Sequence, residues 1–347
     1  MLVHNRDLFP DDSLVEIYSA IKPILVNPIV DDRFRGHEIA ASRAKRIYHR
    51  RGRVASMLVM FGALFTVADA LVIPKGGDPA QLGVASSLLA GVSLLAILMA
   101  ISGLVLQVHL IMTKMKTSWL INRFAAERLR SIKFQAYGLV GQVQTTQALQ
   151  TLADAFYTRE TSRLDAELNA REAALALFRP RTALAPTGVA GTNTGSPLLP
   201  EAQNAYRDLR ISYQKRFATD EIQALRAEQR IGFTTADLLY LLGAALAVAA
   251  LSCKIFYAEA ETIAHWIDFG AVCSFVVGLT KSLTENASLG QSSLVRYEDY
   301  VDALDDCERE LLGSIASFEE TVKRFERVVL DELAQFSQAA AQISYRM

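Results

Sequence analysis

The sequence predicts an all-α integral membrane protein with four transmembrane helices in two hairpins, long cytoplasmic helices and a C-terminal coiled-coil-like helix. Three observations lead to this fold class. Two pairs of apolar segments are each joined by a short loop, basic residues gather at one end of the pairs, and apolar residues recur every three or four positions near the C-terminus. The composition, 51% hydrophobic and 21% charged, is therefore the sum of membrane segments and charged helices.

The first predicted segment, residues 1–36, is cytoplasmic. It contains Pro10, Pro23 and Pro28 and no apolar run in its first 30 residues, so we expect no cleaved signal peptide.

The first hairpin belongs to a segment over residues 37–140, with spans at 54–73 and 82–112. A bilayer core needs about 20 apolar residues of helix, and the turn sequence PKGGDP separates the two spans. The second span exceeds that length, which indicates tilt or a cytoplasmic extension.

Basic residues set the predicted orientation. Six Arg and Lys residues lie between positions 43 and 53, at the entrance to the first span, whereas the two outer loops hold one Lys between them. The positive-inside rule then places both termini and the central region in the cytoplasm. A cluster at a membrane entry needs no nucleic acid to explain it.

The central segment, residues 141–235, is predicted to be helical and cytoplasmic. A helix can run from the end of the second span to about Phe178. Residues 179–201 are rich in Pro, Gly and Thr, and we predict a flexible linker there.

The second hairpin, within residues 236–280, has predicted spans at 238–256 and 263–279. The short connection YAEAET requires them to be antiparallel. Small residues recur at intervals of four, and we interpret them as helix-packing positions. They are Gly243 and Ala247 in the first of these spans and Gly270, Ser274 and Gly278 in the other.

The last segment, residues 281–347, is predicted to be one long cytoplasmic helix. From Tyr297 to Phe336 its apolar residues are spaced by about 3.5 positions on average, which is typical of a coiled-coil seam.

Polar residues inside the spans are candidates for a conduction path, since they are costly in hydrocarbon. Asp69 and Asp268 would lie near the outer face, where they form an acidic mouth or extend into the headgroups. Ser86, Ser93 and Gln107 share one stripe of the second span, which lines a water path or makes a tight helix contact.

Enzyme and cofactor signatures are missing from the sequence. It has no GxxxxGK[ST], HExxH or CxxC motif and no nucleophile with a nearby base, so we expect no enzyme, metal or cofactor. Three scattered cysteines predict no disulfide framework. The many acidic residues of the long helices are interpreted as solvated surface charge paired with Arg and Lys.

One helix carries a family resemblance. Trp119, Arg123 and Glu127 step by four along a helix that leaves the membrane, followed by Arg128. With the basic helix and hairpin before it, this string resembles the SLATT superfamily of bacterial two-transmembrane effector domains, over about residues 37–140. On physical grounds the tryptophan suits a membrane-interface anchor and the Arg–Glu pair suits a bridge between adjacent helices.

The resemblance implies a pore-forming or membrane-depolarising effector of an antiphage or nucleotide-signalled conflict system. It would be a multi-pass homo-oligomer in the lipid bilayer of the bacterial inner membrane, released by a nucleotide signal or a cytosolic sensor protein. The alternative is a non-conducting scaffold that recruits a cytosolic partner through its helices, and the C-terminal seam favours it. A membrane enzyme or transporter has the least support.

Overall fold

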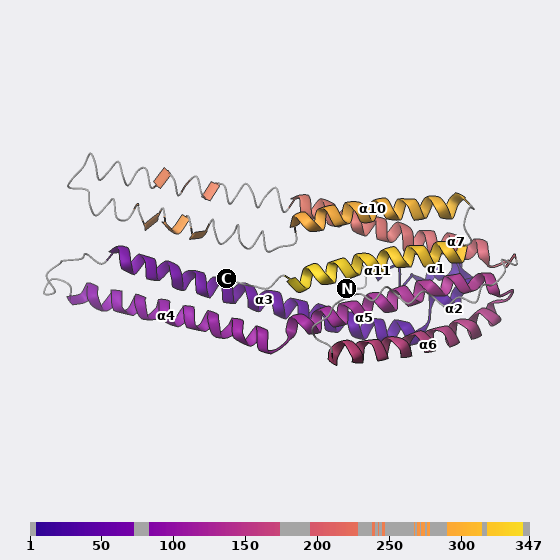
Figure 1. Cartoon of the computed structure of the whole chain (residues 1–347), viewed down its shortest axis with the longest axis horizontal. Helices are drawn as coiled ribbons and strands as arrows, with labels where there is room; N and C mark the ends of the chain where they lie inside the picture. The colour runs from indigo at the N-terminus through magenta and orange to yellow at the C-terminus, as the bar shows by residue number, and fades with distance from the viewer. Residues whose placement is uncertain are drawn as a thin grey trace. The chain divides into compact units, whose positions relative to one another are not determined.

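The chain is helical throughout the part that can be described (Figure 1). The computed structural model describes residues 5–72, 83–173, 195–227, 290–313 and 318–342, with isolated helical positions between 238 and 277. All regular elements in these ranges are helices, which confirms the all-α prediction for them.

The helices form two compact units that interleave along the chain. Unit 1 combines Met1–Ala44, Thr117–Leu225 and Gln291–Gln342, and unit 2 combines Lys45–Lys116, Arg226–Gly290 and Ile343–Met347. Each apolar pair of the sequence falls in unit 2, and the charged stretches before, between and after them make up unit 1.

Unit 1 begins with short helices that lead into a long one. The Asp11 side chain caps the first of them by accepting a hydrogen bond of 3.1 Å from the Leu14 amide. Pro28 opens the long helix, a position where its missing N–H is not needed. The elements are α1 (Asp12–Ile17), η2 (Ser19–Ile21), α2 (Lys22–Leu25) and α3 (Pro28–Val72).

The rest of unit 1 is built from helices on both sides of the second hairpin. A π-helical turn, η5, continues α7, and helical structure extends from it over residues 212–227. The elements are α5 (Met115–Gln135), η4 (Ala136–Gln142), α6 (Thr146–Ala173), α7 (Leu199–Tyr206), η5 (Arg207–Ile211), α10 (Gly290–Gly313) and α11 (Phe318–Gln342).

Aromatic rings from distant segments form the centre of the unit 1 core. Tyr206 lies edge-on to Tyr137, Phe318 and Phe325, with ring centroids 5.5–5.9 Å apart, and Phe134 stacks on Tyr137 at 5.6 Å. All five rings are buried, so α5, η4, α7 and α11 share one hydrophobic core.

The structure corrects the predicted helix from the second span to Phe178. Lys114, with a φ of 49°, separates α4 from α5, and the 3-10 turn η4 separates α5 from α6. Gly138 lies in this second break, and a Cβ there would lie only 3.2 Å from the Glu319 Cγ of α11. The glycine lets α11 approach, and the helix gives way to a tighter turn.

The predicted linker over 179–201 is also corrected at its C-terminal end. Leu198 is buried, the buried Ser196 hydroxyl donates to the Val143 carbonyl oxygen at 2.6 Å, and α7 begins at Leu199. Residues 195–201 are therefore part of the packed unit, and residues 179–194 lie outside the described residues.

The predicted C-terminal coiled-coil-like helix is wrong in two respects. The segment forms two helices, α10 and α11, and the apolar seam faces the core of unit 1. Leu304 and Phe325 are fully buried there, and Tyr300, Val329 and Leu333 nearly so. An apolar stripe of this period serves an intramolecular core as well as a coiled coil.

Unit 2 contains the end of α3 and the whole of α4 (Gly83–Met112), whose bounds agree with the predicted span at 82–112. Leu94, Ile101 and Val105 of α4 are more than half exposed. Of the described helices, one stretch within Ile97–Gln142 is long and apolar enough to cross a membrane. The second hairpin falls almost wholly outside the described residues.

Candidate functional site

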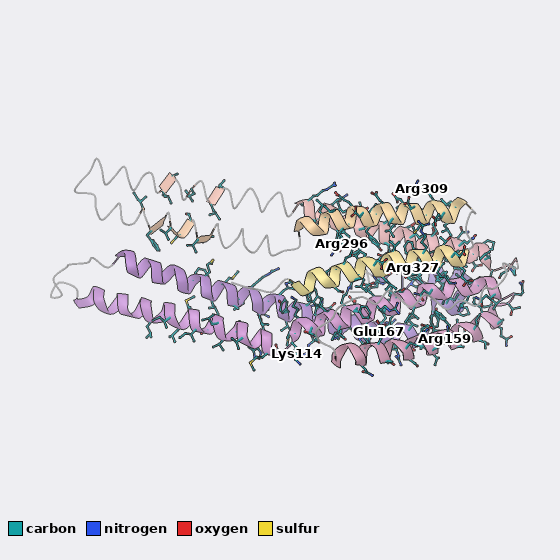
Figure 2. The ribbon with its side chains drawn as sticks, in the orientation of Figure 1. Lys114, Arg159, Glu167, Arg296, Arg309 and Arg327 are labelled. Atoms are coloured by element: carbon teal, nitrogen blue, oxygen red, sulfur yellow. The ribbon has the colours of Figure 1, made fainter. Side chains whose placement is uncertain are left out.

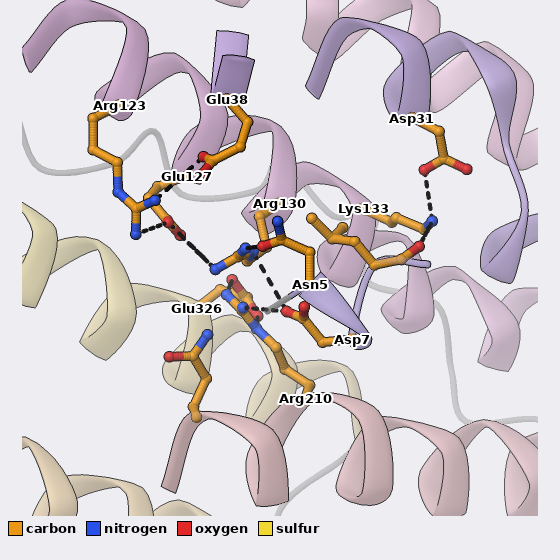
Figure 3. Close-up of polar contacts among 12 residues, drawn as sticks. Asn5, Asp7, Asp31, Glu38, Arg123, Glu127, Arg130, Lys133, Arg210 and Glu326 are labelled. Carbon is orange, nitrogen blue, oxygen red and sulfur yellow. Dashed lines mark hydrogen bonds and ion pairs between the residues drawn. The ribbon is translucent and has the colours of Figure 1, made fainter. Parts of the chain in front are cut away.

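A chain of ion pairs crosses the interior of unit 1 (Figure 3). Its axis is α5, which presents Arg123, Glu127 and Arg130 at spacings of four and three, so that they share one helix face. Glu127 and Arg130 are buried, although charged residues are rarely buried in proteins. This chain of ion pairs is the candidate functional site, and we call it the buried ionic network.

The first link of the network joins α5 to α3. Arg123 contacts Glu127 at 2.6 Å and Glu38 of α3 at 3.3 Å. Burial alone raises the pKa of Glu127, but Arg123, Arg130 and Arg210 hold it below its usual value. Glu127 is therefore an anion inside the protein, held by arginines on either side.

The middle of the network is Asp7, from the N-terminal segment. Its Oδ2 atom lies 3.4 Å from Arg130 Nε and 3.7 Å from Arg210 Nη1. Both distances exceed that of a good charge-assisted hydrogen bond. Burial raises the pKa of Asp7, and the two arginines oppose this shift only in part. Asp7 is thus the least well satisfied member of the network.

The inner end of the network is a two-pronged pair between Arg210 and Glu326. Arg210 Nε and Nη2 donate to the two carboxylate oxygens, each at 2.8 Å, and the Tyr206 hydroxyl donates to Oε1 at 3.2 Å. The Arg210 guanidinium also lies 4.6 Å from the ring centroid of Phe134. Burial alone lowers the Arg210 pKa, but Glu326 and Asp7 raise it above its ordinary value.

The π-helical turn η5 contains Arg210. Such wide turns are rare and occur mostly as single turns inserted into α-helices, often at functional sites. Leu209, Arg210 and Ile211 are all buried, so the wide turn brings three consecutive side chains into the core.

Residues 5–9, which we call the N-terminal strap, supply acceptors to the cations of α5. Lys133 Nζ donates to the Leu8 carbonyl oxygen and to Asp31 Oδ1, each at 2.6 Å. Arg130 donates to the Asn5 side-chain oxygen. Leu8 is fully buried and Phe9 packs on Phe34 at 5.9 Å. The strap is therefore an integral part of the interior.

The structure places the family-motif residues on α5. Arg123 pairs with Glu127 along α5, as the spacing predicted, and the bridge to α3 is made by Glu38, which the sequence did not identify. Trp119 is 9% exposed and lies edge-on to Phe336 of α11 at 6.3 Å, so its expected place as a membrane-interface anchor is corrected to the core of unit 1. Arg128 faces Glu167 of α6 at 3.9 Å (Figure 2 labels Glu167).

The candidate pathway residues are located only by their helices. Asp69 falls in α3 and Ser86, Ser93 and Gln107 fall in α4, and their side chains lie outside the described part, as does the whole of Asp268. The acidic mouth and the polar stripe stay predictions.

Few of the residues predicted to pack the second hairpin lie in the part of the chain that the structure describes. A Cβ on Gly270 would lie 3.5 Å from Leu246 Cδ1, an ordinary van der Waals distance, and Ser274 is partly buried. Gly243, Ala247 and Gly278 lie outside the described residues.

Sequence reasoning missed most of the buried ionic network. It treated most acidic residues of the helices as solvated, which is wrong for Asp31 and Glu326, and only Glu127 was paired with an arginine. Within α5 a signal was available, because Arg130 and Lys133 follow Arg123 and Glu127 on the face that also carries Phe134. No such signal marked Asp7 or Arg210.

The network binds helices together and offers no evident reaction centre. Its carboxylates contact guanidinium or ammonium groups, and among the described residues no group of three His, Cys, Asp or Glu is placed to hold a metal ion. Comparison with protein-family models, with curated proteins and with solved structures finds no match for this chain.

Proposed function

We propose that this chain is a membrane effector that permeabilises or depolarises the bacterial inner membrane, with unit 2 in the bilayer and unit 1 as its cytosolic control domain. The carrying observation is the contrast between the units. The described part of α4 exposes Ile97, Leu104 and Val108 by more than half, while unit 1 holds a chain of seven linked charges, five of them buried. Apolar exposure of this kind supports contact with lipid.

The buried ionic network supports a control role for unit 1. Removing one partner of a buried pair leaves an uncompensated charge, so such a network is stable when complete and unstable when partly broken. An element with two alternative packings is what a switch requires. A nucleotide signal or a sensor protein that competes for the strap or for α11 would break the buried ionic network and release unit 1 from the packing described above.

The four-span arrangement and the homo-oligomer belong to this proposal. Asp69, Asp268 and the stripe of Ser86, Ser93 and Gln107 would line the path, and an acidic mouth would favour cations. The SLATT resemblance of residues 37–140 supports the effector role. The scaffold alternative loses its best support, because the C-terminal seam is buried inside unit 1.

A voltage-sensitive dye tests the proposal in cells that express the full chain. We expect deletion of residues 1–9 to depolarise the membrane without phage challenge, and Asp69→Asn or Asp268→Asn in the same background to reduce the signal. Asp302→Asn, on the exposed surface of α10, is the matched control and leaves the signal unchanged. An unchanged potential in the deletion variant and under phage challenge would exclude a depolarising effector.

A further inference from the structure

Positive charge gathers at one end of the unit 2 hairpin. Helix α3 carries Lys45, Arg46, Arg50, Arg51 and Arg53 within nine residues, and all but Arg51 are exposed. At the end of α4 and just beyond it are His109, Lys114 and Lys116 (Figure 2 labels Lys114). We call these eight residues the cationic collar.

Acidic residues are sparse in the sequence on either side of the collar along α3 and α4. Between Glu38 and Asp69, and between Asp78 and Glu127, the sequence contains no Asp or Glu. Asp69 is 16 residues along α3 from Arg53, about 24 Å at 1.5 Å per residue. That separation is well beyond the Debye length of about 8 Å at physiological ionic strength.

A contact between the two helices fixes part of the collar. Arg51 Nη1 lies 3.1 Å from His109 Nε2, and since arginine only donates, the histidine nitrogen accepts. This contact ties α3 to α4. Nearby, burial and the charges on Lys45 and Arg53 lower the pKa of His49. The formal charge of the collar is that of its arginines and lysines.

The surface changes from cationic to apolar within one or two helical turns of the collar. On α3, Val54, Met57 and Phe61 are 42–54% exposed, and on α4, Val108 and Met112 are 54% and 75% exposed. A phospholipid matches this order, because its charged phosphate would face the collar and its acyl chains would face the apolar residues. A nucleic acid would cover the charges and leave this apolar band in water.

We propose that the cationic collar binds the headgroups of anionic phospholipids, whose acyl chains lie along the apolar band of α3 and α4. The inference rests on the proposed membrane insertion of unit 2, and it adds a lipid preference to it. A basic residue near an anionic surface contributes roughly a fivefold increase in affinity. The protein is thus expected to prefer phosphatidylglycerol over phosphatidylcholine and to lose this preference at high salt.

Native mass spectrometry of the full chain in neutral detergent tests the collar. We expect phosphatidylglycerol to bind more tightly than phosphatidylcholine, and the double variant Arg50→Gln, Arg53→Gln to bind it roughly 25-fold more weakly. The matched control is Arg159→Gln, Arg309→Gln, which removes the same charge from the exposed surface of unit 1 (Figure 2) and retains the preference.

Two outcomes would overturn the collar proposal: equal binding of the two lipids by the native chain, or the same loss in the control variant. Flotation with vesicles of phosphatidylcholine and, separately, with vesicles that contain phosphatidylglycerol distinguishes this from a failure of the proposed function. A chain that floats without lipid preference contradicts the collar alone, and a chain that floats with neither lipid contradicts membrane insertion itself.

Discussion

Arg210 and Glu326 lie 116 residues apart in the sequence and meet in a two-pronged ion pair, with both side chains fully buried. The pair joins the π-helical turn η5 to α11, and Phe134 covers the guanidinium. A lysine in place of Arg210 could not reproduce this geometry, because a single ammonium group cannot donate in a planar fork.

Removing one member of this pair is expected to destabilise unit 1 strongly. Arg210→Met leaves Glu326 and Asp7 buried without their shared cation, and the free energy of unfolding should fall by about 3–5 kcal/mol. The double variant Arg210→Met, Glu326→Leu should recover a large part of the loss, since apolar residues replace both charges. Chemical denaturation of the detergent-solubilised chain measures both values.

Two substitutions calibrate that result. Arg309→Met breaks an exposed pair with Asp306 and should change the free energy of unfolding by at most about 1 kcal/mol. Arg123→Met, at a side chain 31% exposed, should fall between the two. Equal losses for Arg123→Met and Arg210→Met would contradict the inference that burial sets the energetic weight of each link.

Glu332 is expected to make stability pH-dependent near neutrality. Burial raises its pKa to about 7, against the partial opposition of Arg296 at 3.4 Å. The folded state therefore binds a proton that the unfolded state has released, so this group's contribution is present below pH 4.5 and is lost as the pH rises to about 7. The loss is on the order of 3 kcal/mol.

Glu332→Gln should remove this contribution. Thermal unfolding midpoints at pH 5 and pH 8 should differ less in the variant than in the native chain, and the variant should be the more stable of the two at pH 8. Glu320→Gln, at an exposed position of the same helix, is the control and should leave the native difference intact. The same pH dependence in native chain and Glu332→Gln would argue against the raised pKa.

Trp119 is expected to be shielded from lipid. The chain has two tryptophans, so Trp266→Phe leaves Trp119 as the only one. Because Trp119 packs on Phe336 in unit 1, brominated acyl chains should quench its fluorescence weakly in vesicles. The reciprocal Trp119→Phe variant reports on Trp266 and serves as the comparison. Strong quenching of Trp119 would restore its interpretation as an interface anchor.

Leu8 is expected to hold the N-terminal strap in place. Leu8→Ala removes a fully buried side chain, and truncations of this kind cost about 2–5 kcal/mol. Amide hydrogen exchange should then accelerate in residues 5–9 before it does in α5 or α11. Ile17→Ala, at a side chain 64% exposed, is the control and should not affect the strap. Uniform acceleration throughout unit 1 would mean that the strap does not open separately.

The elements whose signal is local were predictable from the sequence. The bounds of α4 follow from a continuous apolar run, and the contact of Arg123 with Glu127 follows from a spacing of four along one helix. The apolar period from Tyr297 to Phe336 predicted helix correctly, but the same period suits a coiled coil and a core, so it could not tell which surface the seam would meet.

The network itself depends on contacts that local patterns do not encode. Asp7 meets Arg130 and Arg210, from segments that lie after the first hairpin and just before the second. These distant partners decide whether a charged residue is solvated or buried. Because charged residues are usually exposed, the sequence of a single helix predicts that its charges are solvated. Only Arg123, Glu127 and Arg130 of α5 had neighbours on their own helix that pointed to each other.

The interleaved order of unit 1 also sets when it can form during synthesis. The strap leaves the ribosome before Arg210, which follows the first hairpin, and Glu326 emerges only after the second hairpin. Domains usually fold as their segments appear, but this interior is incomplete until α11 has been made. A nascent chain therefore contains both hairpins before it can complete the buried ionic network. A copy that terminates before α11 would have both hairpins and no complete network.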